Sequence, residues 1–233
     1  MTCEHGGNRV PEPYRYLFEG EQDLLASHRG FDPGALTMAQ AMATHFRAPL
    51  LASTVSRLVV DLNRSIGHRH LHRQAIFALA AEVRQEIVAR FYHPYRLEAR
   101  RLVAQGVARR GRVVHVSCHS FTDNLDGVLR RADIGLLYDP ARPGERALCA
   151  RWKSVLRVIA PELEVRRNFP YEGRNDGMTT WLRTLFPPDH YLGIELELNQ
   201  SNVLHPARTW TLLRRSLVTS LNTVLGASAE ALP

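Results

Sequence analysis

The chain has 233 residues, of which 45% are hydrophobic, 23% charged and 8% aromatic. This composition is typical of a globular protein and excludes collagen-like, disordered and disulfide-scaffold classes. The longest apolar runs are far shorter than the ~20 residues of a membrane-spanning helix, and the first residues show no signal-peptide pattern. We therefore expect a soluble, cytoplasmic protein with no membrane partner.

The formal net charge is +7, and almost all of the positive charge comes from arginine, because Lys153 is the only lysine. A basic balance favours anionic ligands. The arginines are spread along the chain, whereas nucleic-acid binding requires basic and aromatic residues on one surface. We therefore expect a small carboxylate ligand rather than a nucleic acid. The three cysteines form no CxxC pair, so neither a disulfide framework nor a zinc ribbon is indicated.

Hydrophobic periodicity predicts helices and strands that alternate along the chain. The expected helices span residues 37–46, 74–91, 95–106, 144–159, 179–185 and 209–225. The expected strands span residues 58–62, 113–117, 134–138, 162–167 and 191–198. This alternation favours an α/β fold: a single domain over residues 1–233, with a central, mixed but mostly parallel sheet flanked by helices.

In such sheets ligands bind beyond the carboxyl ends of the strands, so polar residues at strand ends are the first candidates for a site. These residues are His5, His119, Asp61, Asn63, Arg64, Glu195 and Glu197. Each alone has an ordinary structural explanation, such as a hydrogen-bonded turn histidine, a surface salt bridge or an edge strand with a solvated face. Together, two histidines, an arginine and a glutamate favour metal-assisted hydrolysis of a substrate that bears a carboxylate.

Seven segments carry a family resemblance, in family order and across most of the chain. They are CEHGGNRVP (3–11), SHRGFDPGA (27–35), SRLVVDLNRS (56–65), YHPYR (92–96), HVSCHSFT (115–122), RRNFPYEG (166–173) and IELELNQ (194–200). With them the chain resembles the N-formylglutamate amidohydrolase family, distant relatives of zinc carboxypeptidases and aspartoacylase-type deacylases. The set is specific for the family and less so for the substrate. The resemblance implies a zinc-carboxypeptidase-like fold.

The resemblance also implies the metal ligands. His5 and His119 fall on the family's metal-binding histidines. The relatives have an acid three residues after the first histidine, but this chain has Asn8 there, and an amide is a poor metal ligand. The third ligand is therefore open; Asp32 is our candidate, and Glu4 is less favoured.

The remaining implied roles concern the substrate and the proton. Asn63 and Arg64 match the pair that holds the substrate carboxylate, with help from Arg57, and Asn168 and Tyr171 are expected to line the pocket. Glu197 matches the general base, because Asn199 then falls where the family has its Asn. Glu195, two residues away on the same face, is the alternative.

The resemblance therefore implies a hydrolase that uses one zinc ion, with other divalent metals open, to cleave N-formylglutamate into formate and glutamate. Another acyl amino acid or a small peptide is the alternative substrate. The competing hypothesis is a non-catalytic, metal-free member that binds small anions or nucleic acid, because Asn8 departs from the family pattern. Residues 1–3 are also shorter than a typical strand, which indicates a start further upstream or a weakly anchored His5. The oligomeric state is left open.

Two further histidine groups have more than one interpretation. The run of His68, His70 and His72 resembles a metal-binding tract, but we favour a solvated or substrate-proximal loop. His28 is either a ligand or a second-layer partner of one, and a structural role is favoured. The chain has no nucleophile elbow, P-loop or dinucleotide fingerprint, which disfavours serine hydrolases, nucleotidases and Rossmann enzymes.

Overall fold

The computed structural model describes residues 1–204 and 207–229; residues 205–206 and 230–233 of the expected domain lie outside the described residues. A six-stranded sheet has the order β2-β1-β3-β8-β6-β7. Its strands are β1 (Thr2–Cys3), β2 (Leu51–Ala52), β3 (Val113–Phe121), β6 (Ile134–Leu137), β7 (Val165–Arg167) and β8 (Tyr191–Asn199). Every neighbouring pair is parallel except β6 and β8. The expected α/β class with a mixed, mostly parallel sheet is confirmed.

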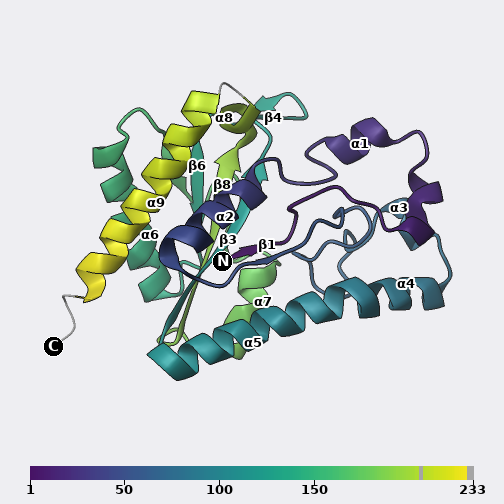
Figure 1. Cartoon of the computed structure of the whole chain (residues 1–233), viewed down its shortest axis with the longest axis horizontal. Coiled ribbons are helices and arrows are strands. Elements are labelled where there is room, and N and C mark those ends of the chain that lie inside the picture. Colours follow the sequence, from purple (N-terminus) through teal and green to yellow (C-terminus); the bar gives the residue numbers. More distant parts are fainter. Residues whose placement is uncertain (205–206, 230–233) are drawn as a thin grey trace.

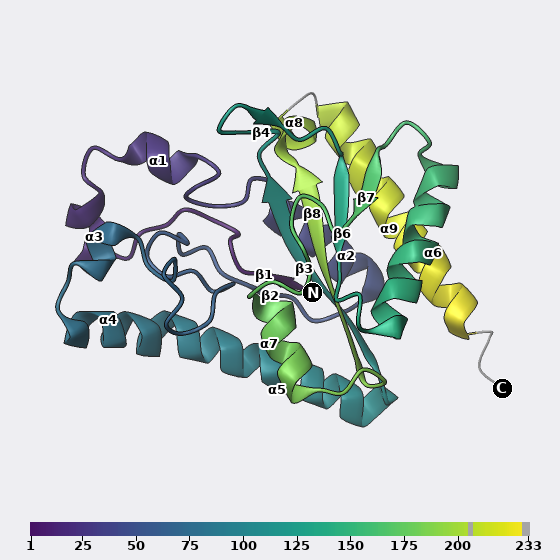
Figure 2. The same cartoon turned by 180° about the vertical axis from the view of Figure 1, so that it is seen from behind.

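Helices cover both faces of this sheet (Figures 1 and 2). On one face lie α2 (Ala35–Phe46), α6 (Pro143–Ile159) and α9 (Ala207–Ala229), and on the other lie α5 (His93–Arg110) and α7 (Met178–Leu185). The shorter elements are η1 (Glu12–Phe18), α1 (Gln22–Ala26), α3 (Gln74–Phe77), α4 (Ala81–Ile87), η2 (Val88–Tyr92) and α8 (Gln200–Leu204). A small antiparallel hairpin joins β4 (Asn124–Leu125) to β5 (Val128–Leu129).

The two central strands separate apolar from polar side chains by simple alternation. Val116 and Cys118 of β3 and Ile194 and Leu196 of β8 pack into the core beneath α2, α6 and α9. The residues that alternate with them, among which are His119 and Glu197, therefore face the opposite side. All nine residues of β8 are buried, because β8 lies between β3 and β6. The two glutamates thus stand on a central strand and not on a solvated edge.

The strand expected at residues 58–62 does not form, and this prediction is wrong. Val59, Val60 and Leu62 are buried in the core below α5, but their backbone follows turns. The Val59 N–H donates to Ser56 O within a turn, and the Asp61 N–H donates to Leu71 O of a neighbouring loop segment, so neither hydrogen bond belongs to a strand ladder. A short buried apolar run has the same sequence pattern whether it is extended or not.

The helix expected at residues 74–91 is also different. It is interrupted after α3, and its later part joins α5 through the π-helical segment η2, so that α4, η2 and α5 form one long rod (Figure 1). The gap expected between the helices at 74–91 and 95–106 is therefore absent. In the π segment the His93 N–H donates to Val88 O, five residues back. This wider turn immediately precedes Pro94, which has no N–H to donate. No helix within residues 1–204 or 207–229 is long and apolar enough to cross a bilayer.

Candidate metal centre and active site

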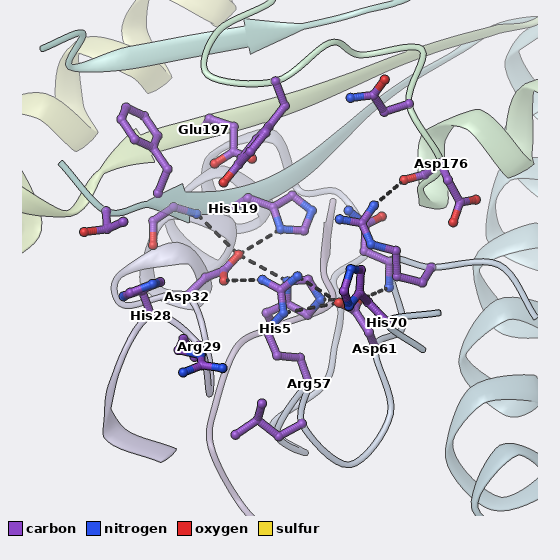
Figure 3. A pocket seen from close by; sticks show the side chains of 18 of the residues that line it. His5, His28, Arg29, Asp32, Arg57, Asp61, His70, His119, Asp176 and Glu197 are labelled. Carbon is purple, nitrogen blue, oxygen red and sulfur yellow. Dashed lines mark hydrogen bonds and ion pairs between the residues drawn. The ribbon is translucent and has the colours of Figure 1, made fainter. Parts of the chain in front are cut away.

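A cavity of about 740 Å³ opens at the carboxyl ends of the parallel strands. His5 enters it from the segment after β1, His119 from β3 and Glu197 from β8 (Figure 3). His119 and Glu197 are direct partners in the register of the two strands. The sheet therefore brings together three of the expected site residues, which are separated by up to 192 positions in the chain.

Three buried side chains converge at the floor of the cavity. Asp32 Oδ2 lies 3.3 Å from His5 Nδ1 and 2.9 Å from His119 Nδ1. The three atoms lie within 4.8 Å of one another, and no other trio of His, Cys, Asp or Glu within the described ranges has this arrangement. Asn8 is exposed and does not line the cavity. The geometry thus favours Asp32, and not Glu4, as the third member of the group.

The far edge of each histidine ring is held by a buried carboxylate. His5 Nε2 lies 2.7 Å from Asp61 Oδ1, and His119 Nε2 lies 3.2 Å from Glu4 Oε2. A proton on each Nε2 would be donated to these acids, which leaves the Nδ1 lone pairs directed at Asp32. This is the second layer that metal-binding histidines use to fix their tautomer and orientation.

Arg57 links the two aspartates of the site. Its guanidinium donates to Asp61 Oδ2 from Nε at 3.2 Å and Nη2 at 2.8 Å, and to Asp32 Oδ1 from Nη1 at 3.3 Å. Burial would raise the pKa of Asp61, but the Arg57 and His5 charges outweigh it and hold that pKa well below its usual range. For Asp32, burial is likewise outweighed by the His5 charge and the His119 hydrogen bond, so its pKa is also lowered. Arg57 therefore orients the carboxylates of the site, and its donors are already directed at them.

This donor set fits a divalent cation. Two imidazole nitrogens and one carboxylate oxygen are the protein ligands of many catalytic zinc sites, which leave a further position for water or substrate. Glu197 supplies a second observation, because its Oε2 is buried and has no hydrogen-bond partner. A buried carboxylate oxygen without a partner is costly, and a water bound beside the cation would satisfy it. His5, His119 and Asp32 could thus hold one cation next to Glu197.

The two glutamates of β8 have different surroundings. Glu195 Oε1 accepts a hydrogen bond of 2.7 Å from Thr179 Oγ1, which ties it to α7. Glu197 has no such tie at Oε2. Burial raises the pKa of Glu197 to about 7, against the opposing effect of the His119 charge. A carboxyl group with a pKa near neutrality is suited to accept and return a proton, so Glu197 fits the role of general base better than Glu195.

Comparisons with known proteins identify the family of this chain. The family model of N-formylglutamate amidohydrolase matches residues 1–204. The chain belongs to this amidohydrolase family. A gene product of Agrobacterium tumefaciens has a similar structure, with a TM-score of 0.81 and 27% identity over 98% of this chain and 90% of that one. The N-formylglutamate amidohydrolase of Ralstonia eutropha shares the fold, with a TM-score of 0.71 and 20% identity over 99% and 94% of the two chains. None of the curated proteins compared with the chain matches it.

Within this amidohydrolase, Asn63 and Arg64 both line the cavity, but each also holds the loop on which it stands. Asn63 Oδ1 accepts a hydrogen bond of 2.6 Å from the N–H of Met178, the first residue of α7. Arg64 Nη1 donates to Asp176 O at 2.7 Å. The Arg64 guanidinium has no carboxylate partner among the described residues, in contrast to Arg57, so it is available to a ligand.

The two residues expected from the RRNFPYEG segment separate. Tyr171 lines the cavity, is 44% exposed, and accepts a hydrogen bond of 3.1 Å from Arg130. Asn168 is not among the lining residues. Its Oδ1 accepts hydrogen bonds from the Tyr138 N–H at 2.9 Å and the Gly173 N–H at 3.3 Å, and its own φ is +49°. Asn tolerates this left-handed conformation and bonds local backbone well, so Asn168 shapes the turn instead of contacting a ligand.

The histidine run at residues 68–72 forms part of the cavity wall. His70 and His72 line the cavity, as does His28 on the opposite loop, and the run forms no metal-ligand group among the described residues. Asp61 and Glu4 are among the candidates from the sequence, but the sequence does not predict that their carboxylates hold the two histidine rings. Asp61 is 56 residues from His5 in the chain, and no local pattern marks the contact.

Proposed function

We propose that this chain is a zinc-dependent amidohydrolase that cleaves N-formylglutamate to formate and glutamate. The observation that carries this proposal is the convergence of His5 Nδ1, His119 Nδ1 and Asp32 Oδ2 beside the unpartnered carboxylate oxygen of Glu197. Family membership supports the amide as the bond that is cleaved. The name of the similar protein from Ralstonia eutropha supports the formyl group and glutamate as the two halves of the substrate.

In this proposal His5, His119 and Asp32 hold one cation, and the second-layer contacts of Asp61 and Glu4 keep the two rings in place. When bound, the metal polarises the acyl carbonyl and acidifies a water molecule. Zinc suits a set of two nitrogens and one carboxylate, although manganese or iron would also accept these ligands.

Glu197 moves the proton. Its carboxylate takes a proton from the attacking water as the water oxygen bonds to the acyl carbon, and it returns that proton to the amine nitrogen as the carbon–nitrogen bond breaks. Its buried position and its pKa of about 7 suit both steps near neutral pH. The products are then formate and an amino acid, with no co-reactant other than water.

The arginines of the cavity select a substrate with carboxylates. Arg57 is committed to Asp32 and Asp61, and Arg73 pairs with Glu21. Among the described residues, Arg29, Arg64 and Arg69 line the cavity without a carboxylate partner. We assign Arg64, beside Asn63, to the α-carboxylate, because a guanidinium grips a carboxylate with two parallel hydrogen bonds. Arg29 and Arg69 remain available for the side-chain carboxylate of glutamate.

The test combines metal analysis with a substrate panel. Purified protein is expected to hold about one zinc ion per chain, and to release formate from N-formylglutamate faster than from N-formylalanine or N-formyllysine. Removal of the metal by a chelator should abolish release, and added zinc should restore it. Zinc-loaded protein that releases no formate from any formyl amino acid would contradict the proposal and favour the alternative of a non-catalytic anion-binding member.

The cellular location is a smaller part of the proposal. Cys3, Cys118 and Cys149 are all buried and free. Free thiols are typical of reducing compartments, so we place the protein in the cytoplasm.

A further inference from the structure

The YHPYR segment, residues 92–96, has no role in the proposed chemistry and does not line the cavity. It lies where η2 joins α5, on the long rod that runs beneath the site (Figure 1). Tyr92, Tyr95 and Arg96 are all buried. Residues three and four apart lie on one side of a helix, so these three side chains leave the rod together and toward the sheet.

Two of the three side chains meet at one backbone atom of the loop that carries Arg64. Tyr92 Oη and Arg96 Nη2 each donate a hydrogen bond of 2.8 Å to the carbonyl oxygen of Arg64. A carbonyl has two lone pairs, so both acceptor sites of this oxygen are used. The backbone of Arg64, whose guanidinium reaches into the cavity, is thereby fixed to the rod.

The guanidinium of Arg96 is buried without a carboxylate partner, which costs free energy. Arg96 is 3% exposed, and its guanidinium lies 5.0 Å from the ring centres of both Tyr92 and Trp181. None of the described carboxylates pairs with it, and its Nε has no partner. Aromatic faces and one carbonyl compensate a buried charge only in part. A planar guanidinium can stack and donate at once, which a lysine ammonium cannot, so the position suits arginine specifically.

The third side chain reaches the metal centre by another path. Tyr95 Oη lies 3.2 Å from Glu4 Oε1 and 3.1 Å from Leu51 O, and can donate to either. Glu4 is fully buried, and its other oxygen accepts from Ser117 Oγ at 2.6 Å and lies 3.2 Å from His119 Nε2. Tyr95 therefore helps to fix the carboxylate that orients His119.

The π-helical segment η2 sets the direction in which Tyr92, Tyr95 and Arg96 leave the helix. An extra residue in one turn rotates the side chains that follow relative to those that precede it, and such turns are frequent at functional sites. Tyr92 is the last residue of η2, and α5 begins at the next position. The rotation thus occurs at the point where the three side chains turn toward Arg64 and Glu4.

We propose that Tyr92 and Arg96 are positioning residues for Arg64, and that Tyr95 is a positioning residue for His119 through Glu4. One helical face then sets the distance between the Arg64 guanidinium, which binds the substrate carboxylate, and the metal ligand His119. The inference rests on the proposed function for the role of Arg64, whereas the Tyr95 branch requires only that His119 binds metal.

The Arg64 branch is tested with Tyr92→Phe and Arg96→Lys in zinc-loaded protein. Binding of glutamate, the proposed product, is measured by calorimetry, and we expect the Kd to rise by up to about 10-fold, the upper end of the range for one lost hydrogen bond. The KM for N-formylglutamate should rise more than kcat falls. The zinc Kd, measured by competition with a chelator, should change less than 2-fold.

The Tyr95 branch is tested with Tyr95→Phe and the same two binding constants. We expect the zinc Kd to rise by up to about 10-fold, the lower end of the 10–100-fold cost of losing a second-layer partner, because Tyr95 acts on His119 only through Glu4. The glutamate Kd at saturating zinc should stay within 2-fold of wild type. The two branches thus give opposite patterns from substitutions on one helical face.

Two buried residues away from the site provide matched controls. Tyr138→Phe removes the hydroxyl group of a buried tyrosine in the main apolar core. Arg142→Lys alters a buried arginine that donates to the carbonyls of Tyr191, Arg183 and Phe186. Each is expected to lower stability at most, and to leave both binding constants unchanged.

Several outcomes would overturn the inference. If the two constants move together in every variant, or if neither moves, the YHPYR face has only a structural role. If zinc-loaded wild-type protein does not bind glutamate, the Arg64 branch is wrong. If it binds zinc and glutamate but releases no formate, the proposed function fails while both branches remain measurable. Should Arg96→Lys not fold, Tyr92→Phe still tests its branch.

Discussion

The strand side and the loop side of the cavity are held in place by different kinds of contact. His119 and Glu197 stand on β3 and β8, which are paired in register over their full length of nine residues. Asp32 and Asp61 stand outside the sheet (Figure 3). Arg64 also lies outside every strand of the sheet. The positions of these three residues depend on a few hydrogen bonds from charged side chains. Arg57 donates to the carboxylates of Asp32 and Asp61, and Arg96 donates to the carbonyl of Arg64.

The difference predicts how each side responds to substitution. A side chain on a fully paired strand can be changed without moving its backbone, because many ladder hydrogen bonds hold that backbone. A loop residue that depends on one or two side-chain bonds moves when one of them is lost. Changes on the strand side should therefore act only through the side chain that is altered, whereas changes on the loop side should also displace neighbouring groups and so alter the affinity for metal or substrate.

The largest effect is expected for Glu197→Gln. The amide is nearly isosteric and cannot accept the proton of water, so kcat should fall about 10³-fold, within the range of general acid–base catalysis. The zinc content should be unchanged, because Glu197 is not one of the three converging ligands. Stopped formate-release assays and metal analysis on the same preparation measure both quantities.

Glu195→Gln is the matched control, two residues away on the same strand. Its Oε1 accepts a hydrogen bond from Thr179 Oγ1, and an amide oxygen can still accept that bond. We therefore expect kcat to fall less than 10-fold. Equal losses in the two variants would contradict the assignment of Glu197 as the base.

The opposite face of the same strand should give a stability effect without a site effect. Leu196 is fully buried between Glu195 and Glu197 but packs on the other side of the sheet. Leu196→Ala should lower the free energy of unfolding by about 3 kcal/mol, as for large-to-small core substitutions. Urea unfolding measures this loss, and the zinc Kd of the folded protein should not move. A large change in zinc affinity would show that the two faces are coupled.

The strand side is also the part that the sequence predicts best. Alternation in residues 191–198 places Glu195 and Glu197 opposite Ile194 and Leu196, and the structure confirms this because the pattern depends only on the two-residue period of a strand. The alternation of helices and strands also predicts the α/β class with a mixed, mostly parallel sheet, which the structure confirms.

The loop side is predicted less well, for a physical reason. The expected strand at 58–62 is a set of turns, and the contacts of Asp61 with His5 and Arg57 depend on how those turns place its side chain. Such contacts join residues that are far apart in the chain, and neither hydrophobic periodicity nor local propensity relates their positions. Asn168 shows the same limit: its identity suited a ligand contact, but its Oδ1 accepts from backbone N–H groups of a turn.

The pH dependence of metal-free protein gives a further test of the strand side. The pKa of Glu197 is raised to about 7 in the folded state, above its usual unfolded value of about 4.3. Folded protein therefore keeps a proton that unfolded protein loses, so the Glu197 contribution to stability is full below about pH 4 and is lost as the pH rises through 7. At about 1.4 kcal/mol per pKa unit, the full loss is about 4 kcal/mol.

Comparison of wild type with Glu197→Gln isolates this contribution, because the amide does not titrate. Urea unfolding in the presence of a chelator, at pH 4.5 and at pH 8, should show the variant gaining about 3 kcal/mol relative to wild type at the higher pH. A difference that does not change with pH would mean that Glu197 is ionised throughout and that burial does not control its proton.

The smallest effect is expected on the loop side, for Asp61→Asn. The amide oxygen can still accept from His5 Nε2, but the charge that holds the ring and Arg57 is lost. We expect the zinc Kd to rise 10–100-fold, the usual cost of altering a second-layer partner, while kcat at saturating zinc falls much less than in Glu197→Gln. Asp133→Asn is the control, because Asp133 hydrogen-bonds Glu164 and Asn202 away from the cavity. If Asp61→Asn instead abolished kcat with zinc fully bound, the loop side would take part in the chemistry, and the division between a reacting strand side and a placing loop side would not hold.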